Sequence, residues 1–290
     1  MARLRTRSHR VVLNRSQGGD VGIFILLALL GVMMFLPMFY VIAQSLKPLD
    51  EIFMFPPKFY VVSPTLENFT DLFSLMNESW VPFSRYIFNT IFVSLTGTFG
   101  NLFVSSLAAY SLAKIKFPGR KWIFQLIVYS LMFHETVTAI ANFITMSALG
   151  LIDTLWARIV PALATSLGLY LMKQFMESHV SDQILESARL DGCSELKTFW
   201  LIAMPMVKPG WLTLIVETFK NLWNAGSSIY IHSEQYKSFN YAIQQIVSGG
   251  IARSGAGAAA TVIMMIVPII IFIICQSNII ETMGTSGMKD

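Results

Sequence analysis

Charge is scarce in this sequence. Only 13% of its 290 residues are charged, while 54% are hydrophobic, and the formal net charge is +4. In an average soluble domain about a quarter of the residues are Asp, Glu, Lys or Arg, so the composition excludes an ordinary soluble protein. The apolar residues come in runs of about 20 or more, the length that spans a bilayer as a helix. The composition therefore predicts a polytopic membrane protein with no separate soluble domain.

Cysteine and histidine are also scarce. The chain has two cysteines, Cys193 and Cys275, and four histidines. The cysteines fall in different kinds of segment, one polar and one apolar, and no His or Cys side chains share the short spacings of a metal site. The sequence therefore predicts neither a disulfide nor a metal site.

Signatures of catalysis are missing as well. The chain has no Gly-x-x-x-x-Gly-Lys-Ser/Thr phosphate loop, so we do not expect it to bind ATP in that way. It also has no Ser/His/Asp arrangement built around a nucleophile elbow. We therefore expect this chain not to be an enzyme.

Long apolar runs, by contrast, are abundant. The first run follows five arginines and is too long for a cleaved signal peptide, so the arginines indicate a cytoplasmic anchor rather than a nucleic-acid arm. The basic cluster at 114–121 places a second turn in the cytoplasm. We predict an all-α fold with a basic cytoplasmic N-terminus (1–20), a transmembrane domain (21–280) and a cytoplasmic tail (281–290). The transmembrane domain should contain six spans, at 21–45, 86–112, 122–144, 155–175, 206–230 and 258–280.

Polar side chains form stripes at helical spacing within two of these spans. Charged groups inside a bilayer are costly and usually face a bundle interior or a watery cavity. The stripes therefore indicate either a solute path or pairs buried between helices, and the candidates for the path are His134, Glu135, Thr138, Asn142, Glu217, Asn221 and Asn224. Small residues four apart in the second span, from Gly97 to Ala109, predict close helix packing. Arg158 is expected to extend toward the membrane surface.

A polar insert at about 176–209 separates the fourth and fifth spans. Ser181 and Ser194 suit the N-caps of two short helices, and Gly192 suits the left-handed turn between them. The second helix should end at Pro205 and carry Leu196, Phe199, Trp200 and Ala203 on one face. Such an elbow could dock into a groove on another protein or lie on lipid headgroups.

The insert resembles the coupling loop of bacterial ABC importer permeases. That loop has a Glu-Ala-Ala, an Asp-Gly and a spaced Phe and Pro, and Ser187 here stands for the middle alanine. The matching residues, and the candidates for coupling to an ATPase, are Glu186, Ser187, Ala188, Asp191, Gly192, Phe199 and Pro205, followed by Pro209. Three further short sequence segments, at 64–68, 107–122 and 223–224, also resemble this family. Together with the insert, they make the chain resemble the smaller permease of the maltose-type carbohydrate importers.

This resemblance implies an obligate complex in the bacterial cytoplasmic membrane. The expected partners are a second, homologous permease forming a heterodimer, two ATPase subunits that hold ATP and Mg²⁺, and an extracytoplasmic sugar-binding protein. No cofactor and no nucleic acid are expected on this chain, and both its ends should be cytoplasmic. Two alternatives stay open: a permease of the same superfamily for a non-sugar solute such as a polyamine, or a proton-coupled secondary transporter using Glu135 or Glu217.

Overall fold

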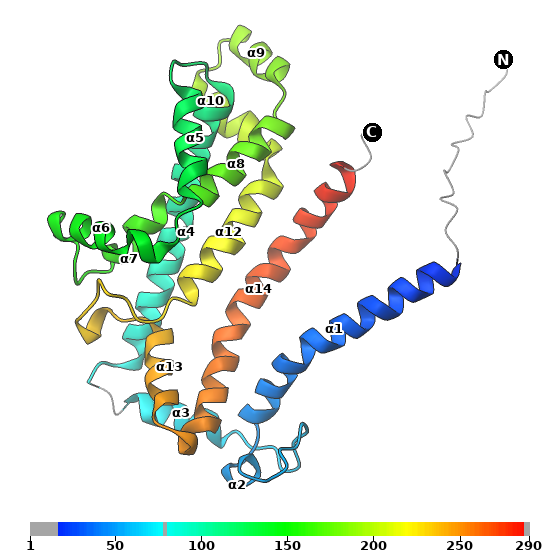
Figure 1. Cartoon of the computed structure of the whole chain (residues 1–290), viewed down its shortest axis with the longest axis vertical. Coiled ribbons are helices and arrows are strands. Elements are labelled where there is room, and N and C mark those ends of the chain that lie inside the picture. The colour runs from blue at the N-terminus through cyan, green and yellow to red at the C-terminus, as the bar shows by residue number, and fades with distance from the viewer. Residues whose placement is uncertain (1–16, 78–79, 287–290) are drawn as a thin grey trace.

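The computed structural model describes residues 17–77 and 80–286, and in these ranges the chain folds into helices and loops without a strand (Figure 1). The five arginines near the N-terminus and the last four residues of the expected tail lie outside the described residues. Residues 281–286, expected in the tail, continue the last helix, α14 (Ser254–Ser286).

Four helical stretches are long and apolar enough to cross a membrane. They are α1 (Gln17–Ser45), α4 (Phe83–Lys114), the run Trp156–His179 and the first part of α14. The third of these comprises α7 (Trp156–Leu163) and α8 (Ser166–His179). They correspond to the first, second, fourth and sixth predicted spans, which confirms a multi-span helical protein.

The predicted fifth span is bent and shorter than expected. The helical run Glu195–Met206 meets α12 (Lys208–Trp223) at 82°, so together they make a broken span or a re-entrant loop. The prediction that the helix runs to residue 230 was wrong. It ends at Trp223 because the next carbonyls, of Ala225 and Gly226, bind side chains of Arg158 and Ser238 instead of continuing the helical ladder.

The predicted third span is interrupted. The structure has α5 (Arg120–Ser130) and α6 (Glu135–Ala148), with an extended residue, His134, between them. The His134 ring accepts a hydrogen bond from the backbone N–H of Thr136 at 3.3 Å and so caps the start of α6. Apolar composition cannot reveal such a local break, and the count of six spans stays a prediction.

Helix α4 is the centre of the bundle. It packs against α7, α8 and α12, and its small residues make this possible, as predicted. A side chain at Gly97 would collide with Leu222 of α12, since an added Cβ would lie 2.5 Å from its Cδ1. The fully buried Asn101 amide donates hydrogen bonds to the Ala162 carbonyl at 2.7 Å and the Thr165 hydroxyl at 3.0 Å. These contacts hold α12, α7 and α8 close to α4.

Buried apolar side chains form two clusters at the two ends of the bundle. One joins α3 (Glu67–Asn77), α13 (Phe239–Ser248), α12 and α14 around residues such as Trp223 and Phe239. The other lies where α4 and α8 meet the polar insert, around Met172 and Phe199. The insert is therefore packed against the bundle rather than hanging from it.

Buried polar groups shape the segment between α1 and α3, which contains α2 (Leu49–Ile52). The ammonium of the buried Lys47 donates to the carbonyl of Lys58, and the Glu51 carboxylate accepts the backbone N–H of Val62 at 2.9 Å. Asn68 donates to the carbonyls of Ser45 and Lys47 at 2.9 and 2.7 Å. Since buried polar groups are costly unless paired, these bonds give the loop a defined shape.

Helix α1 leans away from the other helices in Figure 1. It contacts α14, but the apolar side chains of its membrane-spanning stretch are exposed along most of their length, from Val21 to Phe39. In a membrane protein such a face is covered by lipid or by another subunit.

Candidate functional site

The polar insert forms a rigid elbow, defined here as residues 182–198. It consists of α9 (Asp182–Leu190), a turn and α10 (Glu195–Thr198). Gly192 has a φ of +80°, the left-handed value that sequence reasoning predicted for it. Its N–H donates to the Arg189 carbonyl, and the Cys193 N–H donates to the Ala188 carbonyl, both at 3.0 Å. This pair of bonds is a complete Schellman motif, which fixes the direction in which the chain leaves α9.

The second helix starts as predicted but continues differently. The Ser194 hydroxyl accepts the Lys197 N–H at 3.4 Å, which confirms the N-cap, whereas Ser181 holds the corresponding position before α9 without a side-chain bond. After α10 comes a π-helical turn, Phe199–Ala203, and then α11 (Met204–Met206). The helical run ends at Met206, one residue after the predicted end at Pro205, and the wider π turn relieves the clash that proline makes in an α-helix.

The π turn also divides the apolar face that the sequence predicted. Phe199 is 1% exposed and Ala203 is fully buried, while Leu196 and Trp200 are exposed. The Phe199 ring packs on Tyr110 of α4, with 5.4 Å between ring centroids. The structure therefore places Phe199 under the bundle and leaves Trp200 at the surface.

The Glu195 carboxylate fastens the elbow to α4. One oxygen accepts the Tyr110 hydroxyl at 3.0 Å, and the other accepts the Arg189 Nε at 2.7 Å. The bond to Glu195 holds the pKa of the Arg189 guanidinium above its usual value. At the start of α9, the Lys114 ammonium lies 2.8 Å from Asp182, and that hydrogen bond keeps the pKa of the Asp182 carboxyl below its usual value. Two cross-links thus join α9 and α10 to the end of α4.

The candidate coupling residues divide into two groups. Ala188 and Phe199 are buried and hold the elbow against the bundle. The exposed members are Glu186, Ser187, Asp191, Gly192 and Pro205. Beside Gly192 lies a cavity of about 660 Å³ whose lining includes Leu196, Trp200 and Leu201. Leu190, at the tip, is 89% exposed, so the elbow presents apolar and acidic side chains to whatever it meets.

The polar stripe on α12 is shorter than predicted. Glu217 pairs with Lys220 at 2.9 Å and accepts the Asn221 amide at 3.1 Å. Asn224 is the C-cap of α12, and Ser228 lies in the following loop, so neither continues the helical face. The side-chain amide of Asn224 is exposed and makes no hydrogen bond within the described part of the chain.

The second predicted stripe lies on α6, apart from α12 in Figure 1. His134 caps this helix, and Glu135 is its first residue. Thr138 and Asn142 are exposed. A ring contact between Phe143 and Tyr230, at 6.3 Å, ties the helix to the loop after α12. The two stripes therefore lie on different helices, α12 and α6, and their role in a solute path stays a prediction.

Two residues that sequence reasoning did not place in a site hold the loop after α12. Arg158 was expected at the membrane surface, but it is half-buried, and its guanidinium binds the carbonyls of Ala225 and Gly226. Asp153, with a φ of +60°, accepts the backbone N–H of Ser233 at 2.7 Å, and hydrogen bonds from Ser233 lower the pKa of its carboxyl. The signal that could have indicated a buried partner is an arginine within an apolar span, which was instead expected to extend to the membrane surface.

Comparison with protein families gives one match over most of the chain. Residues 102–283 match the family described as "Binding-protein-dependent transport system inner membrane component". The matched range contains the elbow, α12 and most of α14.

Individual relatives and a solved structure agree with this match. The sn-glycerol-3-phosphate transport system permease protein UgpE of Yersinia enterocolitica is 32% identical over 143 residues, 49% of this chain and 50% of that protein. The arabinooligosaccharides transport system permease protein AraQ of Bacillus subtilis is 26% identical over 263 residues, 90% of this chain and 92% of that protein. In the first three relatives the match spans 50%, 66% and 50% of the relative's length.

The fold is that of a subunit of a bacterial ABC transporter involved in the import of the acidic polysaccharide alginate. The two chains superpose with a TM-score of 0.77 and 21% identity, over 91% of this chain and 98% of the other. At this identity the likeness concerns the fold alone.

Proposed function

Because this chain belongs to the family of binding-protein-dependent transport system inner membrane components, we propose that it is the permease subunit of an ATP-driven importer of sugars or oligosaccharides. It is a multi-span membrane protein. We propose that it works in a complex with a second, homologous permease, two ATPase subunits that carry ATP and Mg²⁺, and an extracytoplasmic binding protein that delivers the solute.

One observation carries the coupling part of the proposal: the elbow is both rigid and exposed. Its turn is fixed by the Schellman bonds of Gly192 and Cys193, and Glu195 fastens it to α4. A force applied to the exposed tip is therefore transmitted to α4 and the helices packed on it. Such a fixed attachment is needed if closure of a separate ATPase is to move the membrane helices. The attachment therefore favours an elbow that docks to a protein over one that lies on lipid.

The solute proposal rests on the relatives and on exposed polar groups. Arabinooligosaccharides and alginate are the solutes in the names of one relative and of the solved transporter. Exposed amides such as Asn221 and Asn224 suit sugar hydroxyls, since amides both donate and accept hydrogen bonds. The relative for sn-glycerol-3-phosphate supports a second candidate, a small phosphorylated solute. Uptake that persists without ATP hydrolysis would instead favour the proton-coupled transporter.

We expect Asn224→Leu to lower the apparent affinity for the transported solute about three- to tenfold while the complex still assembles. The reason is the loss of one hydrogen bond with a net value of about 1 kcal/mol. Uptake of labelled oligosaccharide by reconstituted vesicles measures this. Asn142→Leu, an equally exposed amide on α6, is the matched comparison: if only that variant impairs uptake, the path follows α6 and not α12.

The elbow is proposed to lie on the cytoplasmic side, as the basic residues around it indicate. We expect Cys193 to react with a membrane-impermeant maleimide in inside-out vesicles and not in intact cells. Cys275 is buried in α14 and serves as an internal control that should stay unlabelled in both. Labelling of Cys193 in intact cells would invert the proposed topology.

A further inference from the structure

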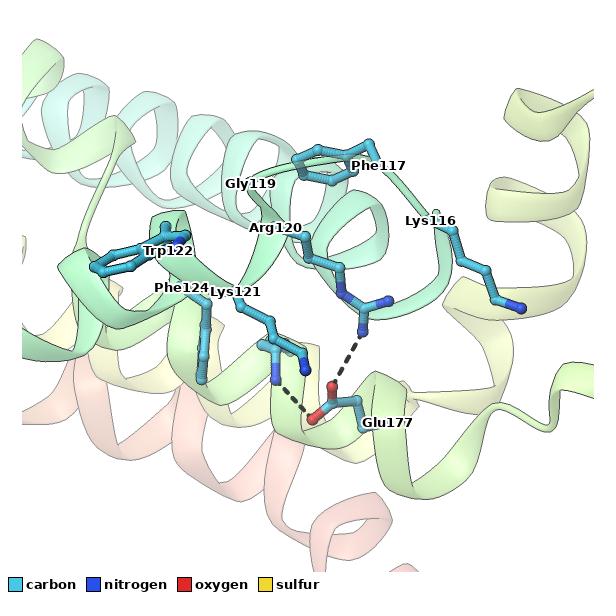
Figure 2. A pocket seen from close by; sticks show the side chains of 9 residues that line it. Lys116, Phe117, Gly119, Arg120, Lys121, Trp122, Phe124 and Glu177 are labelled. Carbon is cyan, nitrogen blue, oxygen red and sulfur yellow. Dashed lines mark hydrogen bonds and ion pairs between the residues drawn. The ribbon is translucent and has the colours of Figure 1, made fainter.

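A basic pocket lies where the turn after α4 meets the start of α5 and the end of α8 (Figure 2). Its volume is about 640 Å³. The residues that line it, named here together as the basic pocket, are Lys116, Phe117, Gly119, Arg120, Lys121, Trp122, Phe124, Lys173 and Glu177. None of them belongs to the elbow or to the polar stripes.

The pocket has more positive charge than its own carboxylate can neutralise. Four cations and one acid line it, a formal excess of three. Glu177 is shared by Lys173 at 2.7 Å and Arg120 at 3.5 Å, the two dashed contacts in Figure 2. Lys121 is exposed and makes no ion pair among the described residues, while the exposed Lys116 is near enough to Asp182 to help lower the pKa of that carboxyl. The pocket can therefore accept an anion without breaking an existing pair.

One side of the pocket is apolar and continues along an exposed apolar face of α5. Trp122 is 73% exposed, and Leu126 and Tyr129 follow it on the same helical face. On the inner side the Lys173 ammonium lies 3.7 Å from the centre of the Phe124 ring, a contact that keeps it within the pocket. A ligand that fills both regions would have a charged head and an apolar tail.

The depth of the pocket in the membrane agrees with such a ligand. It is bordered by the end of one membrane helix, α4 at Lys114, and by the last turns of another, α8 at His179. The ends of membrane-spanning helices are expected at the level of lipid headgroups, where tryptophan and lysine side chains gather. Basic pockets between helix ends are also where acidic lipids bind.

We propose that the basic pocket binds the phosphate of an anionic phospholipid, with one acyl chain lying along Trp122, Leu126 and Tyr129. Lys121 contacts the phosphate oxygens, while Lys116, which points away from Lys121 in Figure 2, adds positive charge at the edge of the pocket. Arg120 and Lys173 stay paired with Glu177 at the base of the pocket. A free phosphate ion would use the lysines but not the apolar face. An acidic segment of a protein partner would use the charges without requiring lipid.

The test is a lipid titration of the assembled, detergent-purified complex, followed by native mass spectrometry. Phosphatidylglycerol is compared with phosphatidylcholine of identical acyl chains, and inorganic phosphate is added as competitor. We expect at least tenfold tighter binding of phosphatidylglycerol. Lys116→Gln/Lys121→Gln should weaken it about 30-fold, about fivefold for each lysine near the membrane surface. Trp122→Ala should weaken binding of both lipids.

The matched control is Lys58→Gln/Arg253→Gln, which also removes two exposed or half-exposed cations but outside both the pocket and the elbow. It should bind phosphatidylglycerol like the wild type. Equal binding of the two lipids by the wild type would overturn the proposal, as would an unchanged affinity in the pocket double variant. Displacement by inorganic phosphate together with no effect of Trp122→Ala would assign the pocket to a free anion. If the double variant released a protein subunit and kept the lipid, the pocket would be a protein contact.

Discussion

Gly192→Val is expected to weaken docking of the ATPase subunits at least tenfold and to abolish uptake, while the chain still inserts into the membrane. Gly192 has a φ of +80°, and a left-handed backbone costs a residue with a side chain about 1–2 kcal/mol, with β-branched residues among the worst suited. An added Cβ would meet nothing within 4 Å, so the effect comes from the backbone and not from a clash. The measurements are co-purification of the ATPase and solute-stimulated ATP hydrolysis.

Two control variants separate this effect from general damage. Gly192→Asn should keep most of the docking, because asparagine tolerates the left-handed conformation. Gly150→Val imposes the same kind of strain at a φ of +66°, again with nothing within 4 Å, but in a loop away from the elbow, so it should leave docking intact. Wild-type docking by Gly192→Val would mean that the elbow is not the coupling element.

Phe199→Ala is expected to destabilise the complex by about 3–5 kcal/mol, the usual cost of truncating a fully buried phenylalanine. The ring is 1% exposed and packs on Tyr110 and Trp200. Its loss would leave a cavity between the elbow and α4, so we expect both a lower melting temperature of the purified complex and uncoupled ATP hydrolysis. Thermal unfolding monitored by tryptophan fluorescence, together with vesicle uptake, measures both.

Trp200→Ala is the matched comparison for Phe199→Ala, since the Trp200 side chain is about half exposed, at 47%. We expect it to change the melting temperature little and to act mainly on ATPase docking. If Phe199→Ala impaired docking without loss of stability while Trp200→Ala destabilised the complex, the assignment of one ring to the bundle and the other to the surface would be wrong.

Features set by neighbouring residues could be predicted from the sequence. The left-handed Gly192 and the cap at Ser194 depend on the chain within a few residues. The stripe from Gly97 to Ala109 was also predictable, because helical periodicity alone brings small residues onto one face. The positions of four spans were confirmed as well, because long apolar runs alone mark them, although their exact ends were not.

Features that depend on distant segments could not be predicted. Glu195 binds Tyr110, which lies 85 residues earlier in the chain. Arg158 reaches carbonyls 67 and 68 residues later, and these contacts hold the chain that follows the end of α12 at Trp223. The division of Phe199 from Trp200 follows from a π turn, for which the sequence carries no simple signal.

The most direct test of the central claim, that the elbow couples this chain to a separate ATPase, is cross-linking from the elbow itself. A photoactivatable maleimide is attached to the native Cys193 in membranes that contain the assembled complex, and the products are identified by mass spectrometry. Gln245→Cys in a Cys193→Ser background places the same probe on α13, at the other end of the bundle. The account predicts an ATPase adduct from Cys193 and none from position 245. An ATPase adduct from position 245 with none from Cys193 would contradict it.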